Sequence, residues 1–230
     1  MSMSYGPSAL WLGEQACRYR TELSPGCSRS RYTSKGHEER ILPILSHSDP
    51  EIKKIIKQNA MLKRSKFMDR GHFCMVFETR SSSRVLKLTA DRTHHAYLVS
   101  KAAPQGPFKP QAHRDFGIVG HTGLGVAVYL LEVERLYPIE RHHPHCNAIN
   151  KLLRFEGRKD RLPATKQDSA DFDPDMLKFM RGLNRFTKRI RAGYDLYMDN
   201  FMQRSDGHLV FSDPIFDPRL ADGYTWRSGS

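Results

Sequence analysis

The hydrophobic positions change from helical to strand spacing between residues 46 and 90. Asp49 can cap a helix that starts at Pro50, because its carboxylate can accept a hydrogen bond from the first helical turn. Apolar residues then recur at helical spacing: Ile52, Ile55, Ile56, Ala60 and Leu62. Strand-like runs follow at 67–68, 74–78 and 84–88, separated by turn residues. The sequence therefore predicts one helix followed by three short strands joined by tight turns.

The pattern changes again in the second half of the chain. Residues 93–103 are typical of a short helix, 104–125 of a loop and a hairpin, and 126–134 of an apolar strand that ends in acids. Residues 145–155 favour a helix, and 156–173 a charged connection. Asp173 can cap a long helix over 174–191. Its broad apolar side contains Met176, Leu177, Met180, Leu183, Phe186 and Ile190.

Composition places the chain among globular proteins outside the membrane. Of the 230 residues, 39% are hydrophobic and 27% charged, which is typical of such proteins. The longest apolar run, residues 126–131, is far shorter than the roughly 20 residues of a membrane-spanning helix. A basic flank and an apolar core typical of a signal peptide are missing from the N-terminus. We therefore expect a cytoplasmic protein with no membrane partner.

A net charge of +12 favours partners with negative potential, such as nucleic acid, enzymes bound to nucleic acid, or nucleotide phosphates. The basic residues are spread over 53–66, 154–166 and 178–191 without a nucleic-acid-binding motif, so a solvated basic surface is the equal alternative. Residues 142–146, His-His-Pro-His-Cys, could be a zinc fragment. A structural zinc site needs four ligands and the sequence has no second half, so we favour a loop.

Candidate chemistry is concentrated near the C-terminus. Asp195, Asn200 and Asp213 follow the spacing D-x4-N-x12-D, and the last aspartate comes just after a short apolar run. Phosphoryl transfer needs a carboxylate to receive a hydroxyl proton, and an amide oxygen with a second carboxylate to hold Mg2+ on the phosphates. Aspartate and asparagine are also turn formers, and Asp213 before Pro214 could make an Asx turn.

A second candidate lies in the strand predicted at 84–88. Lys87 interrupts an apolar run, and a buried ammonium needs a partner. Most such lysines lie on an exposed strand face. A glycine turn with Gly71 lies just before this strand, which gives a functional interpretation of Lys87 more weight. Gly71 could also simply be a hairpin glycine.

Taken together, these motifs resemble those of protein kinases, in kinase order. Asp69-x-Gly71-x-x-Cys74-x-Val76 resembles the glycine-rich loop with only its second glycine, and Val85-Leu86-Lys87 resembles the third-strand V-A-I-K. Residues 129–134 resemble the strand that enters the hinge. More narrowly, residues 68–217, with Gly71-His72-Phe73 and Ser212-Asp213-Pro214, resemble the early serine/threonine protein kinases of T-seven-like podophages (autographiviruses).

This resemblance implies an α+β, two-lobed protein-kinase-like fold with a truncated C-lobe, ATP and Mg2+ as cofactors, and host proteins as substrates in the host cytoplasm. These substrates would include RNA polymerase and RNA-processing enzymes, so that host transcription is shut off. For the nucleotide, the resemblance implies that Gly71 and Lys87 contact the phosphates, that Val76 and Val85 pack on the adenine, and that Glu132 and Val133 form hinge hydrogen bonds. For the reaction, it implies that Asp195 and Lys87 are catalytic and that Asn200 and Asp213 bind the metal.

The implied organisation is an N-terminal arm (1–45), a helix packed on the first lobe (46–67), a kinase-like N-lobe (68–131), a truncated helical C-lobe with the catalytic loop (132–217) and a tail (218–230). No activation segment can fit in the seventeen residues after Asp213. The podophage kinase domains are similarly short.

Other features depart from typical kinases. No glutamate occurs from Leu88 to Leu131 to pair with Lys87, and Gly193-Tyr194 replaces the His-Arg that precedes the loop aspartate. Two alternatives therefore stay open. One is a catalytically weak or inactive kinase-fold protein that binds and inhibits a host enzyme. The other is a small-molecule phosphotransferase.

Overall fold

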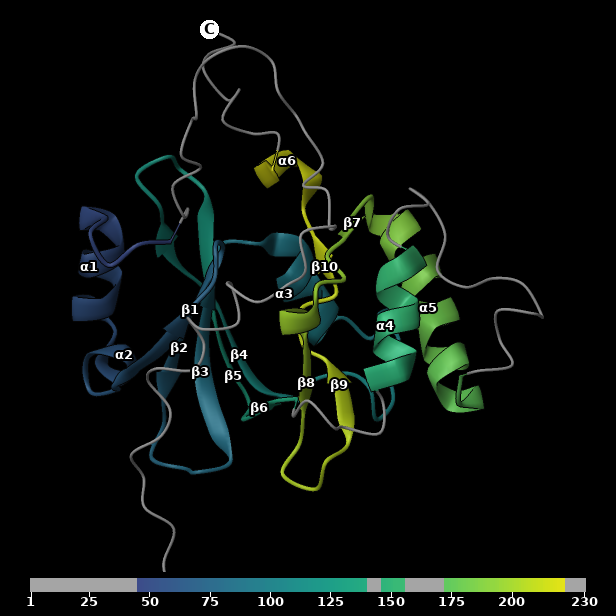
Figure 1. Ribbon diagram of the computed structural model, residues 1–230. Coiled ribbons are helices and arrows are strands. Elements are labelled where there is room, and N and C mark those ends of the chain that lie inside the picture. Colours follow the sequence, from purple (N-terminus) through teal and green to yellow (C-terminus); the bar gives the residue numbers. More distant parts are fainter. Residues whose placement is uncertain (1–44, 140–145, 156–171, 222–230) are drawn as a thin grey trace, which may run out of the picture. The chain divides into compact units, whose positions relative to one another are not determined.

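A five-stranded antiparallel sheet dominates the first half of the chain. The computed structural model describes residues 45–139, 146–155 and 172–221, all within the unit Leu42–Ser230 (Figure 1). The strands are β1 (Phe67–Arg70), β2 (Cys74–Glu78), β3 (Arg84–Thr89), β4 (Ala112–His121) and β5 (Ala127–Glu134). Their order in the sheet is β1-β2-β3-β5-β4, and every neighbouring pair is antiparallel.

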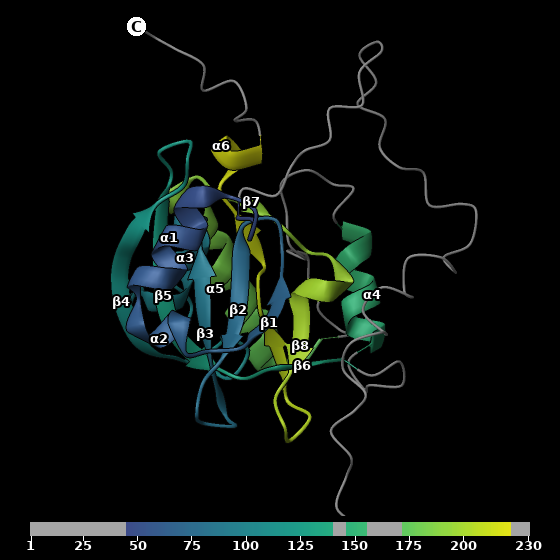
Figure 2. The same ribbon diagram turned by 90° about the vertical axis from the view of Figure 1, so that its left-hand side faces the viewer.

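Two short helices cover one face of this sheet, α1 (Pro50–Gln58) and α2 (Ala60–Lys63), as Figure 2 shows. The predicted start is confirmed: Asp49 accepts a hydrogen bond from Glu51 N, and Pro50 occupies the first turn. The prediction of one continuous helix is wrong. Asn59 adopts an extended conformation, and its side chain caps α2 by accepting hydrogen bonds from the next turn. Ile52, Ile55 and Leu62 are buried against the sheet.

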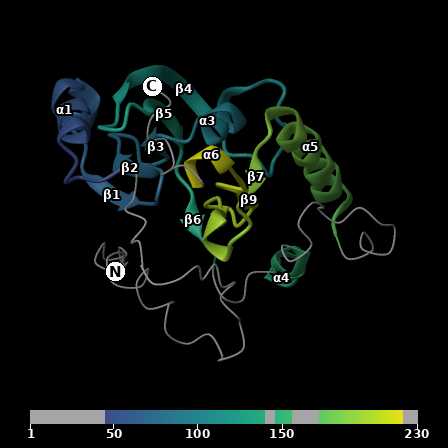
Figure 3. The same cartoon turned by 90° about the horizontal axis from the view of Figure 1, so that it is seen from above.

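Helix α3 (Arg92–Val99) packs on the opposite face, between the sheet and the C-terminal part of the unit (Figure 3). It ends at Ser100, earlier than the predicted residue 103. Successive side chains of a strand point to opposite faces of the sheet, so alternate residues of β3 belong to different faces. Leu86 and Leu88 point toward α1 and α2, whereas Val85 and Lys87 belong to the α3 side. The lobe boundary predicted between residues 131 and 132 falls inside β5.

The C-terminal part contains helices and short strands. The helices are α4 (Cys146–Phe155), α5 (Pro174–Ile190), the 3-10 turn η3 (Met198–Asn200) and α6 (Pro218–Ala221). The strands are β6 (Tyr137–Pro138), β7 (Gly193–Tyr194), β8 (Phe201–Gln203), β9 (Leu209–Phe211) and β10 (Ile215–Phe216). They form sheets β6-β8-β9 and β10-β7, so the segment expected to be a truncated helical C-lobe with the catalytic loop (132–217) also contains short antiparallel sheets. Helix α6 lies in the predicted tail.

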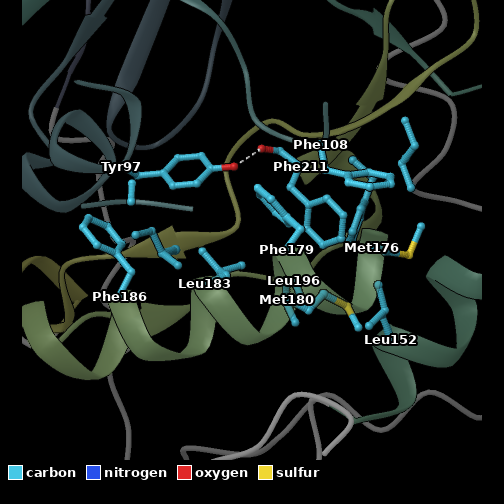
Figure 4. Close-up of a cluster of buried hydrophobic side chains, with 14 of the residues drawn as sticks. Tyr97, Phe108, Leu152, Met176, Phe179, Met180, Leu183, Phe186, Leu196 and Phe211 are labelled. Carbon is cyan, nitrogen blue, oxygen red and sulfur yellow. Dashed lines mark hydrogen bonds between the residues drawn. The ribbon is translucent and has the colours of Figure 1, made fainter. Parts of the chain in front are cut away.

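Helix α5 contributes many of the buried hydrophobic side chains of this C-terminal part (Figure 4). Asp173 caps it as predicted, by accepting hydrogen bonds from Asp175 N and Met176 N, and Arg191 ends it with a left-handed backbone (φ 57°). Its buried apolar side chains are Met176, Leu177, Phe179, Met180, Leu183 and Phe186. They pack around Phe211 of β9 and Tyr97 of α3 in one continuous cluster. The segments on either side of Asp213 are therefore packed against α3.

Several predictions fall outside the described residues. These are the N-terminal arm up to residue 44, the histidines of 142–145 and most of the connection at 156–173.

None of the described helices combines the length and apolarity needed to cross a membrane. The molecule is thus a mixed α+β structure with antiparallel sheets and a few helices.

Candidate functional site

Lys87 and Asp213 lie together although they are far apart in the sequence. Lys87 Nζ is 3.6 Å from Asp213 Oδ2, and the side chains are 13% and 29% exposed. Lys87 lies in the middle of β3, opposite Val76 of β2 and Leu131 of β5. Asp213 follows the end of β9. The lysine in the apolar strand therefore has the partner that burial of an ammonium requires.

Helix α3 supplies a second basic group to the same carboxylate. His94 Nδ1 is 2.6 Å from Asp213 Oδ1, an ion pair when the imidazole is protonated, and the His94 side chain is 1% exposed. Neither ring nitrogen makes a hydrogen bond of regular geometry among the described residues. Sequence reasoning missed this residue because it searched the helix for a glutamate that would pair with Lys87. The only sequence signal is a histidine three positions after the capping Asp91.

Asp91 holds His94 in place by fixing the start of α3. Its Oδ1 accepts hydrogen bonds from Thr93 N (2.7 Å), Thr93 Oγ1 (2.7 Å) and His94 N (3.0 Å). Its Oδ2 accepts a hydrogen bond from Asp217 N at 3.1 Å. Asp217 also forms ion pairs with Arg92 and Arg219. One buried carboxylate thus ties the first turn of α3 to the chain just beyond Asp213.

These contacts fix the charges at the site. Burial alone would raise the pKa of Asp213, but His94 and Lys87 outweigh this effect and lower it to about 2. Burial alone would lower the pKa of Lys87, but the charge of Asp213 outweighs this effect and raises it. Burial raises the pKa of the Cys74 thiol itself. At neutral pH the cluster therefore contains an ionised carboxylate beside a protonated lysine and a neutral thiol.

The loop with Asp195 and Asn200 is bonded to the segment around Asp213. Asp195 N donates to Pro214 O (2.9 Å), and Asn200 Nδ2 donates to Asp195 O (2.7 Å). Ser212 donates to Asn200 O through both N and Oγ, each at 2.9 Å. Because the amide donates through Nδ2, its Oδ1 stays available as an acceptor. The structure thus brings the segments of Asp195, Asn200 and Asp213 into one locus.

The residues before Asp195 have a packing reason for their identity. A Cβ atom added to Gly193 would lie 2.4 Å from Phe216 Cε1, far inside van der Waals contact. Gly193 in β7 pairs with Phe216 in β10, and Tyr194 with Ile215. Tyr194 Oη also donates to Asn184 Oδ1 at 2.9 Å. The dipeptide that replaces the kinase His-Arg therefore anchors the loop by close strand packing and one hydrogen bond to α5.

The glycine turn is a regular hairpin connection. Gly71 lies between β1 and β2, and its N–H donates to Cys74 O at 2.9 Å. An added Cβ would be 3.3 Å from Cys74 Sγ, which is a tight contact. This geometry agrees with the simpler hairpin interpretation, and phosphate contact by Gly71 stays a prediction. Val76 and Val85 share the sheet face of Lys87, with Val85 buried and Val76 partly buried. Their contact with adenine also stays a prediction.

Glu132 and Val133 occupy a different environment from the one expected of a hinge. Both lie within β5 and are flanked by strands on both sides, with Glu132 opposite Leu86 of β3 and Arg114 of β4. The Glu132 carboxylate is 3.4 Å from Arg84 Nη1. Residues inside a sheet have fewer backbone groups to offer a ligand than residues beyond its edge. The proposed hinge hydrogen bonds stay a prediction, and the chain leaves the strand only after Glu134.

The described residues of the cluster offer few side-chain donors for a metal ion. Within the described ranges, no three side chains of His, Cys, Asp or Glu are grouped to hold a metal ion. Mg2+ in nucleotide sites usually needs only one or two carboxylates, with phosphate oxygens and water completing the shell. The part-exposed carboxylate of Asp213 and the Asn200 amide oxygen fit this minimal donor set.

Comparison with protein-family models, with curated proteins and with solved structures finds no match for this chain.

Proposed function

We propose that the chain is a compact, two-lobed serine/threonine protein kinase that transfers the γ-phosphoryl group of ATP to host proteins. The observation that carries this proposal is the contact between Lys87 and Asp213, 3.6 Å apart. Further support comes from the hydrogen bond that joins Asn200 to Asp195. A five-stranded antiparallel sheet with one helix between its third and fourth strands agrees with the expected N-terminal lobe.

Each residue has a role that suits its charge and position. Protonated Lys87 would bind the α- and β-phosphates, and the Asp195 carboxylate would orient the substrate hydroxyl and accept its proton. Asp213 and the Asn200 amide oxygen would hold Mg2+, which neutralises charge on the transferred phosphoryl group. The low pKa of Asp213 keeps it ionised at neutral pH, as this role requires. Catalysis would then come mainly from positioning and charge stabilisation.

One observation favours an inactive protein as the second candidate. Both oxygens of Asp213 contact basic side chains, Oδ2 at Lys87 and Oδ1 at His94. A nucleotide would have to displace at least one of these contacts. A kinase-fold protein that inhibits a host enzyme could keep the cluster for its structural value. Such a protein would bind its partner equally well with or without Asp213.

The test is transfer of label from γ-labelled ATP with Mg2+ to proteins of a bacterial lysate. Removal of one charged group that stabilises the transition state typically costs about 100-fold or more in rate. Asp213→Asn and Lys87→Met should each cause such a loss. The matched controls are Asp199→Asn, exposed in the same loop, and Lys57→Met, exposed on α1, and both should keep full transfer.

The outcomes separate the candidates. Label on protein bands that disappears with Asp213→Asn supports the protein kinase. Label that appears only on a small molecule identifies a phosphotransferase. No transfer from any variant, with retention of the same host partner by wild type and Asp213→Asn, would replace the kinase with the inhibitor. Full transfer by Lys87→Met and Asp213→Asn would refute the site.

A further inference from the structure

A pocket of ≈ 500 Å3 lies away from the Lys87–Asp213 cluster. It is lined by the end of α3 and the residues after it (98–101), by residues 105–106 and 109–111 of the following loop, by the first residues of β4 (112–115) and by Arg204. None of the residues assigned to phosphoryl transfer contributes to its wall. Its volume is within the range of pockets that bind small molecules. It is therefore a separate candidate binding site.

Lys109 is the most unusual residue of this wall, because it is only 8% exposed. Its Nζ is 3.4 Å from Gln105 Oε1 and 5.9 Å from the centre of the Tyr97 ring. No carboxylate lies within ion-pair distance of it in the described part of the chain. An ammonium has three donors, and one long bond to a neutral amide satisfies only one. Burial accordingly lowers the pKa of Lys109.

The surroundings hold Lys109 in this position. Gln105 Nε2 donates to Ala103 O (2.7 Å) and Ser100 O (3.2 Å), which leaves its Oε1 for the lysine. Arg204 Nη2 donates to Lys109 O at 3.0 Å and thereby fixes the loop. A buried amine without an acidic partner is costly. An anionic ligand would supply the missing partner.

The other charges around the pocket favour the same sign of ligand. Lys101 and Arg114 also line it, and neither has a carboxylate partner among the described residues. The two acidic side chains nearby are already paired. Asp115 is bound by His95 (3.1 Å), and Glu134 by Arg204 (2.7 Å). Lys101, Lys109 and Arg114 thus line the pocket without a carboxylate partner among the described residues, and Arg114 lies over the Phe116 ring. Both nearby carboxylates already contact a basic side chain, so the wall suits an anionic ligand.

We propose that this pocket binds phosphate or the phosphate group of a small phosphate monoester, with Lys109 as its central contact and Lys101 and Arg114 as supporting cations. The site is independent of the proposed kinase function. A phosphate dianion matches the number of cations better than a single carboxylate does, and it can accept several hydrogen bonds at once.

The test is the melting temperature of the full chain, measured against inorganic phosphate and against glycerol 3-phosphate at constant ionic strength set with NaCl. A ligand that binds only the folded state raises this temperature in a saturable way. The wild type should respond, and the apparent affinity of Lys109→Met should be at least about tenfold weaker. Lys57→Met, which changes a lysine far from both sites, should respond like the wild type.

Each outcome decides the proposal. Saturation by both probes identifies free phosphate as sufficient, and saturation by glycerol 3-phosphate alone identifies an organic monoester. No saturable response, or an equal response of Lys109→Met, would overturn it. If Lys109→Met does not fold, Arg114→Gln, exposed on the pocket wall, must weaken the response several-fold, and an unchanged response would overturn the proposal.

Discussion

At the scale of single residues, the site depends on how Asp213 is charged. Two basic side chains approach its two oxygens from different elements, Lys87 from β3 and His94 from α3. Burial would otherwise favour the neutral acid. The carboxylate is therefore kept ionised by its tertiary neighbours, and its ionisation reports directly on whether they are in place.

We predict that the pKa of Asp213 is about 2 in the folded wild type, against an ordinary value of about 3.9. In Lys87→Met it should rise, because one of the two cations that stabilise the carboxylate is lost. Carbon-13 NMR of the aspartate carboxyl carbons measures this, with Asp213→Asn to assign the signal. An unchanged pKa in Lys87→Met would contradict the contact.

The same shift affects stability in a defined direction. Because the folded-state pKa is below the unfolded one, ionised Asp213 stabilises the fold above about pH 4, and this contribution is lost as the pH falls toward 2. The wild type should therefore be more stable than Asp213→Asn by a smaller free energy of unfolding at pH 3 than at pH 5. Urea denaturation at the two pH values measures it.

At the scale of elements, the start of α3 is more important than its short length suggests. The helix is capped by Asp91, which is 3% exposed and also binds the backbone of Asp217. The side chain of Asp49, which caps α1, is less buried, and the one hydrogen bond described for it comes from Glu51 N. Asp49 thus stabilises only the start of α1, whereas Asp91 also connects the start of α3 to a distant segment.

We predict that Asp91→Ala destabilises the protein more than Asp49→Ala. Loss of an N-cap costs about 1 kcal/mol, which is the expected effect at Asp49. At Asp91 the change also leaves the buried Asp217 N–H without its acceptor, which adds about 1–3 kcal/mol. Urea denaturation of the two variants measures the difference. Equal losses would show that the contact with Asp217 contributes nothing.

At the scale of the whole molecule, one buried hydrogen bond connects α3 with the C-terminal part. Tyr97 Oη donates to Phe211 O at 3.0 Å, inside the cluster shown in Figure 4. Tyr97 is fully buried, and burial raises the pKa of its hydroxyl well above the usual value. Phe211 N donates to Phe108 O, so β9 is held from two directions two residues before Asp213.

Tyr97→Phe should keep the packing and remove this bond. We expect a loss of about 1 kcal/mol, because the buried Phe211 carbonyl loses its donor while the ring still fills its site. Thermal or urea denaturation measures it, with Tyr137→Phe, an exposed tyrosine on β6, as the control. If the free energy of unfolding falls no more than in the control, the hydrogen bond does not stabilise the fold.

Much of the secondary structure could be predicted from local pattern. The caps at Asp49 and Asp173, the strands around Lys87 and the apolar side of α5 all follow from spacing along the chain, because each depends on neighbours a few residues away. The break at Asn59 and the short strands β6 to β10 could not be predicted in this way. The strands depend on distant pairing partners. At Asn59 the apolar spacing continues through the break, so only its extended backbone shows that one helix ends and another begins.

By itself the sequence determined which residue types the candidate site has and in what order, namely Lys87, Asp195, Asn200 and Asp213. Only the tertiary structure decided their partners. It placed His94 against Asp213 where a glutamate was sought, and it left Lys109 buried beside a separate pocket. The physical reason is that spacing reports on contacts within one element, whereas the partner of a buried charge comes from whichever distant element packs against it.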